Sequence, residues 1–319
     1  MLQFGKNGDF TIVQFTDIHW KNGEPGDEQS YALMKRVIEV EKPDLVVFTG
    51  DVIHSEACHD PFASYREAVK AATESGVKWA AVFGNHDADA HDVSKEQLIA
   101  LQQELPGCVT EAGPQLEDRL GNCCLEIRSG DGQRPAAALY LLDSGGHTDH
   151  PVGGYQWITH GQIGWYKERA GRLQRGNGGV PVPALAFFHI PLPEYNQLWD
   201  YHTCYGVNYE GMGCPKVNSG LFTAFLETGD VRGVFAGHDH VNDFWGELHG
   251  IRLHYGRASG CGEYGQEGAY GKEGMLRGAR VIRLDEENPA EFATWLRLED
   301  GSVVETQPVH PPEKVWKRI

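Results

Sequence analysis

No stretch of this sequence is long and apolar enough to cross a bilayer, which takes about 18 consecutive apolar residues. Residues 1–20 lack a basic region followed by an apolar segment, so no secretory signal is predicted. Lys and Arg form no long run, and the formal net charge of −17 disfavours nucleic acids and anionic membranes as partners. We therefore expect a cytoplasmic protein that acts on a small molecule.

The sequence also lacks a cysteine framework. Its seven cysteines are an odd number, and no two of them form the CxxC pair typical of zinc or redox motifs. Cys204 and Cys214 are close enough in sequence for a contact to be conceivable, but such a pair is expected to stay reduced in a cytoplasmic protein. We therefore expect reduced, partly buried thiols.

Apolar runs of strand length recur along the chain, and each of them ends in polar residues. They are Phe10–Phe15, Asp44–Thr49, Lys78–Phe83, Ala137–Leu142, Ala184–Phe188 and Gly233–Ala236. Helices are predicted at Ser30–Glu41, Pro61–Ser75, Ser94–Leu105 and from Thr159 to about Leu173. Ser94 followed by Gln97 is a capping-box pattern, which indicates the start of a helix.

The order of these elements predicts the fold class. Alternation of strand and helix in the first half favours parallel strands joined by helical crossovers. The second half, above all residues 248–298, has shorter strands and glycine-rich turns. No linker or internal repeat divides the chain. We predict a single domain over residues 1–319, with two packed mixed β-sheets and helices outside them.

Five of the predicted strands end in residues that bind metals. The motifs are Thr16-Asp17-Ile18-His19, Gly50-Asp51, Gly84-Asn85-His86-Asp87, His189 and Gly237-His238-Asp239-His240. In an open α/β sheet, ligands bind beyond the carboxyl ends of the strands. Any one of these motifs alone could be an ordinary surface loop. Five strand ends that carry oxygen and imidazole groups together predict one shared site.

The spacing within the motifs fits such a site. Side chains two residues apart on an extended segment point the same way, so Asp17 and His19 are expected to face one cavity. The same argument applies to His238 and His240. The glycines before Asp51, Asn85 and His238 suit a sharp turn at a strand end, with the backbone close to the site.

The candidate ligands combine carboxylate and amide oxygens with imidazoles. This mixture suits Mn²⁺, Zn²⁺ or Fe²⁺ better than the all-oxygen coordination of Ca²⁺ or a thiolate site. The candidates are Asp17, His19, Asp51, Asn85, His189, His238 and His240. They are too many for one ion that keeps an open position, and they suit two ions ~3.5–4 Å apart that share a carboxylate. We therefore predict two divalent metal ions as cofactors.

The series of motifs from Asp17 to His240 resembles the calcineurin-like metallophosphoesterase superfamily. Lys216–Gly220 and Arg277–Ile282 are similar to its purple-acid-phosphatase-like subgroup. The resemblance implies a four-layer αββα sandwich of two mixed β-sheets flanked by helices. The motifs would lie in residues 17–240, and C-terminal strands in residues 241–300 would complete the second sheet.

The resemblance also implies roles for the motif residues. One metal would take Asp17, His19, Asp51 and His240, and the other would take Asp51, Asn85, His189 and His238. A hydroxide between the ions would attack phosphorus in line. His86 matches the family's catalytic histidine, which is not a ligand and would protonate the leaving alkoxide or stabilise the developing charge. Asp87 is its expected orienting partner.

One position departs from true purple acid phosphatases. They carry a metal-binding tyrosine three residues after the bridging aspartate, where this sequence has His54, and they lack the histidine present here as His19. A ferric–tyrosinate centre is therefore not expected, and a divalent pair is. We expect His54 to lie outside the coordination sphere.

Two loops, residues 144–160 and 193–215, are expected to shape the substrate pocket. Tyr195 and Asn196 follow His189 closely and are predicted to border the substrate. His147, Asp149 and His150 are conceivable as a third metal site, although a solvated loop is the simpler interpretation.

The leading functional hypothesis is a phosphomonoesterase that acts on a small phosphorylated substrate. A phosphodiesterase for cyclic nucleotides or phospholipid head groups would use the same metals and the same His86, so the motifs do not separate the two. A nuclease is disfavoured by the acidic charge. A non-catalytic metal-binding scaffold predicts lost ligands or a lost catalytic histidine, and this sequence keeps them all. No motif predicts an oligomeric state.

Overall fold

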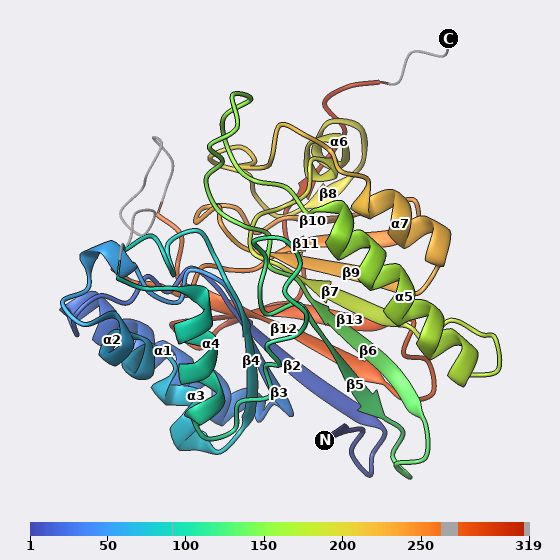
Figure 1. The fold of residues 1–319 in the computed structure, drawn as a ribbon, viewed down its shortest axis with the longest axis horizontal. Coiled ribbons are helices and arrows are strands. Elements are labelled where there is room, and N and C mark those ends of the chain that lie inside the picture. Colours follow the sequence, from blue (N-terminus) through green and yellow to red (C-terminus); the bar gives the residue numbers. More distant parts are fainter. Residues whose placement is uncertain (91, 263–273, 316–319) are drawn as a thin grey trace.

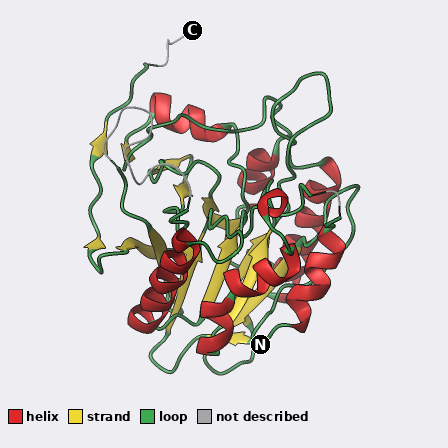
Figure 2. Ribbon diagram, turned by 90° about the vertical axis from the view of Figure 1, so that its left-hand side faces the viewer, coloured by secondary structure: helices red, strands yellow, loops and turns green. Residues whose placement is uncertain are grey.

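The computed structural model describes residues 1–90, 92–262 and 274–315. Two β-sheets pack face to face, with helices on both outer sides (Figure 1). The view turned by 90° looks onto the helices of one outer layer, with the strands behind them (Figure 2). The predicted four-layer αββα sandwich of two mixed sheets is therefore confirmed.

The six-stranded sheet has the order β14-β13-β12-β2-β3-β4. Its strands are β2 (Asp9–Phe15), β3 (Leu45–Thr49), β4 (Lys78–Val82), β12 (Gly278–Asp285), β13 (Phe292–Leu298) and β14 (Val303–Val304). The strands β2, β3 and β4 are parallel, as the alternation of strand and helix predicted. Their carboxyl ends therefore lie at one edge of the sheet.

The nine-stranded sheet has the order β1-β5-β6-β7-β9-β11-β10-β8-β15. Its strands are β1 (Leu2–Gln3), β5 (Cys123–Arg128), β6 (Pro135–Leu141), β7 (Ala184–Phe187), β8 (Cys204–Tyr205), β9 (Val231–Ala236), β10 (Trp245–Leu248), β11 (Ile251–Tyr255) and β15 (Val309–His310). The central strands β6, β7, β9 and β11 run parallel to one another.

We expected the strands after residue 240 to complete the second sheet, but they are divided between both sheets. Strands β10 and β11 extend the nine-stranded sheet, whereas β12 and β13 extend the six-stranded sheet. Strand β12 pairs antiparallel with β2, with Val281 opposite Val13. The C-terminal part of the chain is therefore built into both sheets.

Both faces of the central strands are apolar, so their alternation divides each strand between two cores. On β2, Phe10 and Ile12 pack between the sheets, and Val13 and Phe15 pack against the helices. The outer face of the six-stranded sheet is covered by α1 (Pro25–Glu41), α2 (Pro61–Ala68), α3 (Lys70–Ser75) and α4 (Lys95–Glu104). The other outer face is covered by α5 (His160–Gly176), α6 (Glu194–Tyr201) and α7 (Leu221–Thr228).

The helix starts follow the capping signals in the sequence. Ser94 caps α4 and Thr159 caps α5, each by accepting a hydrogen bond from the backbone N–H three residues on. The first helix begins earlier than expected, at Pro25, because proline suits the first helical position. The segment 61–75 is two helices that meet at Val69. In the described part of the chain, no helix is both long enough and apolar enough to span a membrane.

Candidate dinuclear metal site

The seven predicted ligands lie at carboxyl ends of strands from both sheets. Asp17 and His19 follow β2, Asp51 follows β3, and Asn85 follows β4. His189 follows β7, and His238 and His240 follow β9. All seven side chains are buried. Because the carboxyl ends of these strands meet across the sandwich, residues up to 223 positions apart form one cluster.

The cluster divides into two groups of potential ligands. Asp17, His19 and His240 form one, and Asp51, His189 and His238 form the other. Within each group the potential ligand atoms lie within 4.8 Å of one another. Nε2 of His19 lies 3.0 Å from Nε2 of His240, and Nδ1 of His238 lies 3.2 Å from Nε2 of His189. The family resemblance implies the same partition of these six residues, with Asp51 shared between the two sets and Asn85 added to the second.

Asp51 lies between the two groups. Its Oδ2 is 3.0 Å from Nε2 of His189 in its own group and 3.5 Å from Nε2 of His19 in the other. One carboxylate within this distance of both groups has the position that a bridging ligand needs.

Four of the ligands adopt a left-handed backbone. The angle φ is 53° at Asp17, 51° at His19, 48° at Asp51 and 81° at His238. Such a conformation costs about 1–3 kcal/mol at a residue other than glycine and persists only where the surroundings enforce it. Here Asp17 N donates to the Gly50 carbonyl and His19 N donates to the Asp51 carbonyl, at 3.2 and 2.9 Å.

The prediction that an extended backbone brings Asp17 and His19 to the same side was therefore wrong. The segment 16–19 is not a continued strand, and it turns at both of its ligands. Asp17 and His19 still face one site, but the turns and the bonds to the neighbouring loop bring them there.

Two glycines allow the loops to approach this closely. A Cβ atom at Gly84 would lie 2.1 Å from Oδ1 of Asp51, and one at Gly237 would lie 1.9 Å from Oγ1 of Thr16. No side chain fits at either position without movement of the ligand loops. Their role is close approach of the backbone to the site, as expected for the glycines of these motifs.

Hydrogen bonds outside the cluster orient the ligands. His189 donates from Nδ1 to the Thr49 carbonyl at 2.8 Å, which turns its Nε2 toward the cluster. Asp17 accepts from the Thr16 hydroxyl at 2.8 Å and from the His238 backbone N–H at 3.0 Å. Nη1 of the buried Arg277 donates to the His240 carbonyl at 3.1 Å. No motif predicted this role of Arg277, because the contact joins segments 37 residues apart.

The buried carboxylates and imidazoles shift one another's pKa values. Burial raises the pKa of Asp17 to about 7, against the effect of His189. Burial also opposes the charge on Asp51, but His189 and His19 outweigh it and hold the pKa of Asp51 well below its usual range. Burial acts against the charge on His189 as well, yet the carboxylates of Asp51 and Asp17 raise its pKa to about 10.

His238 and His240 favour the neutral form. Burial, followed by the positive charge on His189, lowers the pKa of His238 to about 3. Burial and His19 hold the pKa of His240 well below its usual range. Neutral imidazole is the form that binds metals, so His238 and His240 are ready to act as ligands. His189 would release a proton on binding a metal, because its pKa is raised.

The side-chain oxygen of Asn85 is a further potential metal ligand. Its Oδ1 is buried and has no hydrogen-bond partner in the described part of the chain. A buried polar atom without a partner costs about 1–3 kcal/mol, which coordination to a metal would offset. The mixture of donors, the central carboxylate and this oxygen fit two divalent ions.

The model of the calcineurin-like phosphoesterase family matches residues 10–242. This chain belongs to that family. It is a metallophosphoesterase, a hydrolase that acts on phosphoric ester bonds, and its relatives are purple-acid-phosphatase-like proteins. The family assignment expected from the motifs is therefore confirmed.

Two relatives illustrate the range of similarity. The probable inactive purple acid phosphatase 29 of Arabidopsis thaliana is 36% identical over 345 residues, which cover 96% of this chain and 87% of the relative. Phosphatase DCR2 of Saccharomyces cerevisiae is 32% identical over 272 residues, which cover 76% of this chain and 46% of the relative.

Solved structures share the fold of this phosphoesterase at low sequence identity. A dimetal phosphatase from Danio rerio aligns with a TM-score of 0.60 and 13% identity, over 95% of this chain and 99% of that one. The purple acid phosphatase PPD1 of yellow lupin aligns with a TM-score of 0.58 and 13% identity, over 96% of this chain and 54% of that one. These similarities support the fold alone.

The carboxylate beside His86 is not the expected one. Asp87 is buried and accepts backbone hydrogen bonds from Gly84 N and Ile53 N, at 2.8 and 3.0 Å. Asp89 instead places its Oδ2 3.3 Å from Nδ1 of His86. Asp87 therefore shapes the loop of the phosphoesterase, and the expectation that it orients His86 was wrong.

The predicted substrate contacts at α6 are also corrected. Tyr195 is fully buried, and its hydroxyl donates to the His254 carbonyl at 2.9 Å, so it belongs to the core beneath α6. The exposed Asn196 donates to Sγ of Cys214 at 3.0 Å. Neither contact leads to the ligand cluster. The sequence placed both residues soon after His189, but the helix directs Tyr195 into the core.

The loop 144–160 does reach the metal site. A Cβ atom at Gly146 would lie 3.6 Å from Cβ of Asn85, and the ring of Tyr155 packs edge-to-face on His238 with centroids 4.5 Å apart. His147 packs beside Tyr155, at 5.0 Å between centroids. In the described part of the chain, the acidic and imidazole groups that could hold a metal include no third group at His147, Asp149 and His150.

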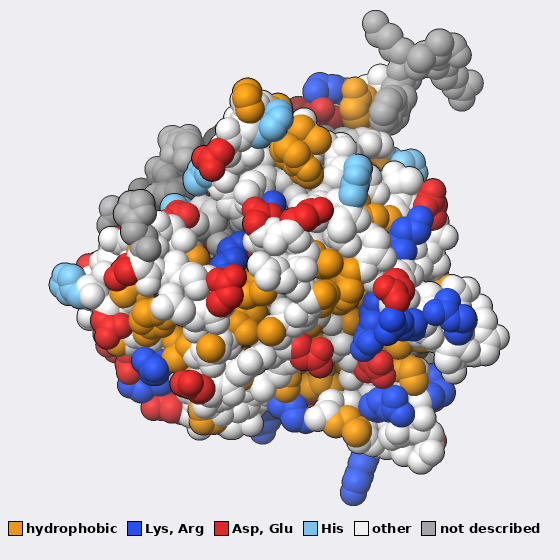
Figure 3. Space-filling model, in the orientation of Figure 1, with side chains coloured by type: hydrophobic (Ala, Val, Ile, Leu, Met, Phe, Trp, Pro, Cys, Tyr) orange, Lys and Arg blue, Asp and Glu red, His pale blue; other side chains and the backbone are white. Residues whose placement is uncertain are grey.

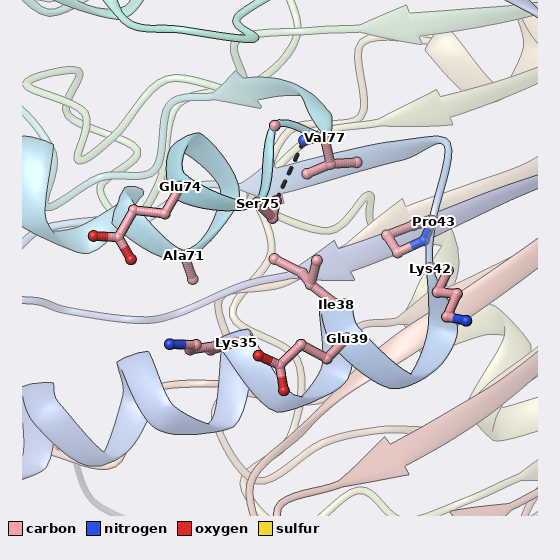
Figure 4. Close-up of a pocket in the computed structure, with 10 residues that line it drawn as sticks. Lys35, Ile38, Glu39, Lys42, Pro43, Ala71, Glu74, Ser75 and Val77 are labelled. Carbon is pink, nitrogen blue, oxygen red and sulfur yellow. Dashed lines mark hydrogen bonds between the residues drawn. The ribbon is translucent and has the colours of Figure 1, made fainter.

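A surface cavity of about 620 Å³ lies between α1 and α3, away from this site (Figure 4). Its lining includes Pro43 and Val77, which precede β3 and β4. The cavity therefore lies at the amino ends of strands whose carboxyl ends carry the ligands. Ser75 accepts a hydrogen bond from the Val77 backbone N–H at its wall, at 3.3 Å.

Proposed function

We propose that this chain is a phosphomonoesterase for small substrates, with two divalent metal ions held by the seven-residue cluster. The observation that carries the proposal is the pair of ligand groups with Asp51 between them and His86 beside them. The rings of His86 and His19 are 5.3 Å apart between centroids. A proton donor thus borders the cluster without being part of either ligand group.

The residues divide the work between holding metals and handling the leaving group. When bound, two divalent ions supply Lewis-acid activation of water and of phosphoryl oxygens. Asp51 would contribute its negative charge to both ions, and the hydrogen bond from His189 to the Thr49 carbonyl fixes the direction of one ligand. His86 keeps 31% of its side chain exposed, so it is accessible to a substrate. It would donate its proton to the ester oxygen that leaves.

The ligand chemistry supports Mn²⁺, Zn²⁺ or Fe²⁺ as the ions. Four imidazoles together with three side chains that offer oxygen suit these borderline ions. His54 stands where a ferric centre would need a tyrosine, and its ring packs 4.8 Å from that of His86. Neither of the two ligand groups includes His54.

Surface charge supports a small substrate rather than a nucleic acid. Basic side chains gather over α5 on the face shown in Figure 3, with acidic ones among them. Lys167, Arg169 and Arg172 on this helix each form an ion pair with a glutamate. Because these cations are already paired with carboxylates and the chain has a net charge of −17, this surface is poorly suited to binding the phosphate backbone of a nucleic acid.

The word "inactive" in the names of the Arabidopsis relatives describes those proteins. In this chain six of the seven predicted ligands form the two groups, Oδ1 of Asn85 is buried without a hydrogen-bond partner in the described residues, and His86 is paired with a carboxylate. A non-catalytic scaffold has no need of either feature. We therefore propose turnover, and a direct assay tests it.

The assay compares a monoester with a diester. The protein is stripped with a chelator and reloaded with Mn²⁺, Zn²⁺ or Fe²⁺, and turnover of p-nitrophenyl phosphate and bis(p-nitrophenyl) phosphate is measured. We expect metal-dependent hydrolysis that favours the monoester and saturates at two ions per chain. Faster hydrolysis of the diester would favour a phosphodiesterase, and no turnover of either ester with any of the three ions would contradict the proposal.

A further inference from the structure

We propose that Asp89 is the positioning residue for His86, and that Ser55 holds the loop in which the two are paired. The inference rests on the proposed function, because it assigns a role within that reaction. Asp89 lies in no motif of the metal cluster, and only the folded loop brings it to His86.

The pairing has a defined geometry. Oδ2 of Asp89 lies 3.3 Å from Nδ1 of His86, and about one third of each side chain is exposed, 32% and 31%. The contact is an ion pair, and Nδ1 of His86 makes no hydrogen bond in the described part of the chain. Because a carboxylate only accepts hydrogen bonds, its position beside Nδ1 favours the tautomer that carries the proton there. The other nitrogen, Nε2, is then left for exchange of a proton with the substrate.

Ser55 fixes the loop that makes this pairing possible. Its hydroxyl donates to the His86 carbonyl at 2.7 Å and accepts from the backbone N–H groups of Asp89 and Ala90, at 3.0 and 3.1 Å. Its own backbone N–H donates to the same His86 carbonyl at 3.0 Å. Four hydrogen bonds from one buried serine therefore fold residues 86–90 into a tight turn. That turn places Asp89 over the ring three residues before it.

The neighbouring candidates do not perform this task. Both carboxylate oxygens of Asp87 accept backbone N–H groups, from Gly84 and Ile53, so Asp87 is used by the loop itself. His54 packs beside His86 with ring centroids 4.8 Å apart, but an imidazole brings no fixed negative charge. Asp89 supplies that charge, with its Oδ2 3.3 Å from Nδ1 of His86.

The consequence is a proton donor whose direction is fixed before the substrate arrives. Under the proposed function, the oxygen of a hydroxide forms a new bond to phosphorus while the ester P–O bond on the opposite side breaks, and the electron pair of the broken bond goes to the departing oxygen. The proton on Nε2 of His86 is transferred to that oxygen, which leaves as an alcohol, and His86 becomes neutral. Asp89 stabilises the imidazolium before the transfer and keeps the ring in line. Its effect should therefore grow with the difficulty of the leaving group.

The test compares Asp89→Asn with wild-type protein on two monoesters. Glycerol phosphate releases a poor leaving group that needs a proton, and p-nitrophenyl phosphate releases a good one that needs little help. We expect kcat for glycerol phosphate to fall about tenfold or more, a part of the ~10²–10⁴-fold that a positioned general acid contributes. We expect kcat for p-nitrophenyl phosphate to fall much less, KM to stay nearly constant, and Asp89→Glu to restore part of the loss.

Asp92→Asn is the matched control, because Asp92 is exposed and lies three residues further along. Asp92→Asn should leave kcat unchanged for both esters. If Asp89→Asn behaves like this control on both esters, or lowers both rates equally, the positioning role is overturned.

A measurement without turnover keeps this inference separate from the proposed function. In ¹⁵N-histidine spectra of the metal-free protein, the His86 Nδ1 resonance is assigned by its loss in His86→Gln. It should move in Asp89→Asn and stay in place in Asp92→Asn, whether or not wild-type protein hydrolyses either ester. A His86 Nδ1 resonance that keeps its chemical shift in Asp89→Asn would overturn the pairing. If the resonance shifts but the wild-type protein hydrolyses neither ester, only the proposed phosphatase function is contradicted.

Discussion

The sharpest structural prediction concerns Gly84, which has no motif role beyond its small size. A Cβ atom there would lie 2.1 Å from Oδ1 and 2.3 Å from the backbone N of Asp51, where ordinary contact begins near 3.4 Å. In Gly84→Ala the two loops must therefore separate by about 1.3 Å, the difference between 3.4 and 2.1 Å. Metal–ligand distances tolerate only about ±0.2 Å, so the central carboxylate cannot keep its place between both ions.

The expected result is a folded protein that no longer holds two ions. Metal content per chain after dialysis against Mn²⁺ or Zn²⁺ should fall from two to one or fewer. Unfolding in urea with chelator present should show a loss of about 1–3 kcal/mol from overpacking.

Gly164→Ala is the matched control, because a Cβ at this position in α5 meets nothing within 4 Å. It should keep both ions and be stabilised by roughly 0.5–1 kcal/mol, since alanine replaces glycine within a helix. A Gly84→Ala protein that binds two ions with wild-type affinity would refute the packing of Gly84 on Asp51.

Three further substitutions test separate parts of the structure. Asp51→Asn removes the negative charge between the two groups, so calorimetric titration should show both ions bound more weakly; loss of one ion alone would show that Asp51 does not bridge. In Asp87→Asn an NH₂ group would face one of the two backbone N–H groups that Asp87 accepts from, so that N–H would lose its acceptor. The free energy of unfolding, measured with chelator present, should fall by about 1–3 kcal/mol. The ratio of the rates on glycerol phosphate and p-nitrophenyl phosphate should stay unchanged. Burial raises the pKa of Asp230 against hydrogen bonds from Tyr166 and Tyr140, so its favourable contribution is complete below the unfolded pKa of 3.8 and is lost as pH rises through the folded pKa. Urea titrations should therefore show that, as pH rises through this window, the unfolding free energy of the wild type falls relative to that of Asp230→Asn. A difference between the two proteins that stays constant with pH would show that Asp230 is not the titrating group.

Much of the site was predictable because its residues are tied to strand ends. A strand that finishes in Gly50-Asp51 or in Gly84-Asn85 places its ligand at one edge of the sheet, whatever the rest of the fold does. The capping residues Ser94 and Thr159 likewise acted through the backbone three residues away, so local sequence was enough to place the starts of α4 and α5.

The errors arose where short sequence distance was taken for spatial proximity. Tyr195 lies six residues after His189, yet α6 turns it into the core. Asp87 is adjacent to His86, yet adjacent side chains diverge, and Asp89 returns to the ring only because Ser55 folds the loop. Tyr155 reaches His238 through a loop whose course no local pattern indicates.

The sequence by itself determined which residue types meet at the site, because strand order and motif identity are written along the chain. Only the tertiary structure decided how they meet. The left-handed backbone at Asp17, His19 and Asp51 is unfavourable for each residue taken alone. It is held by hydrogen bonds between the loops after β2 and β3, such as that from His19 N to the Asp51 carbonyl. Those bonds form only when the two strands lie side by side, and no local sequence pattern contains them.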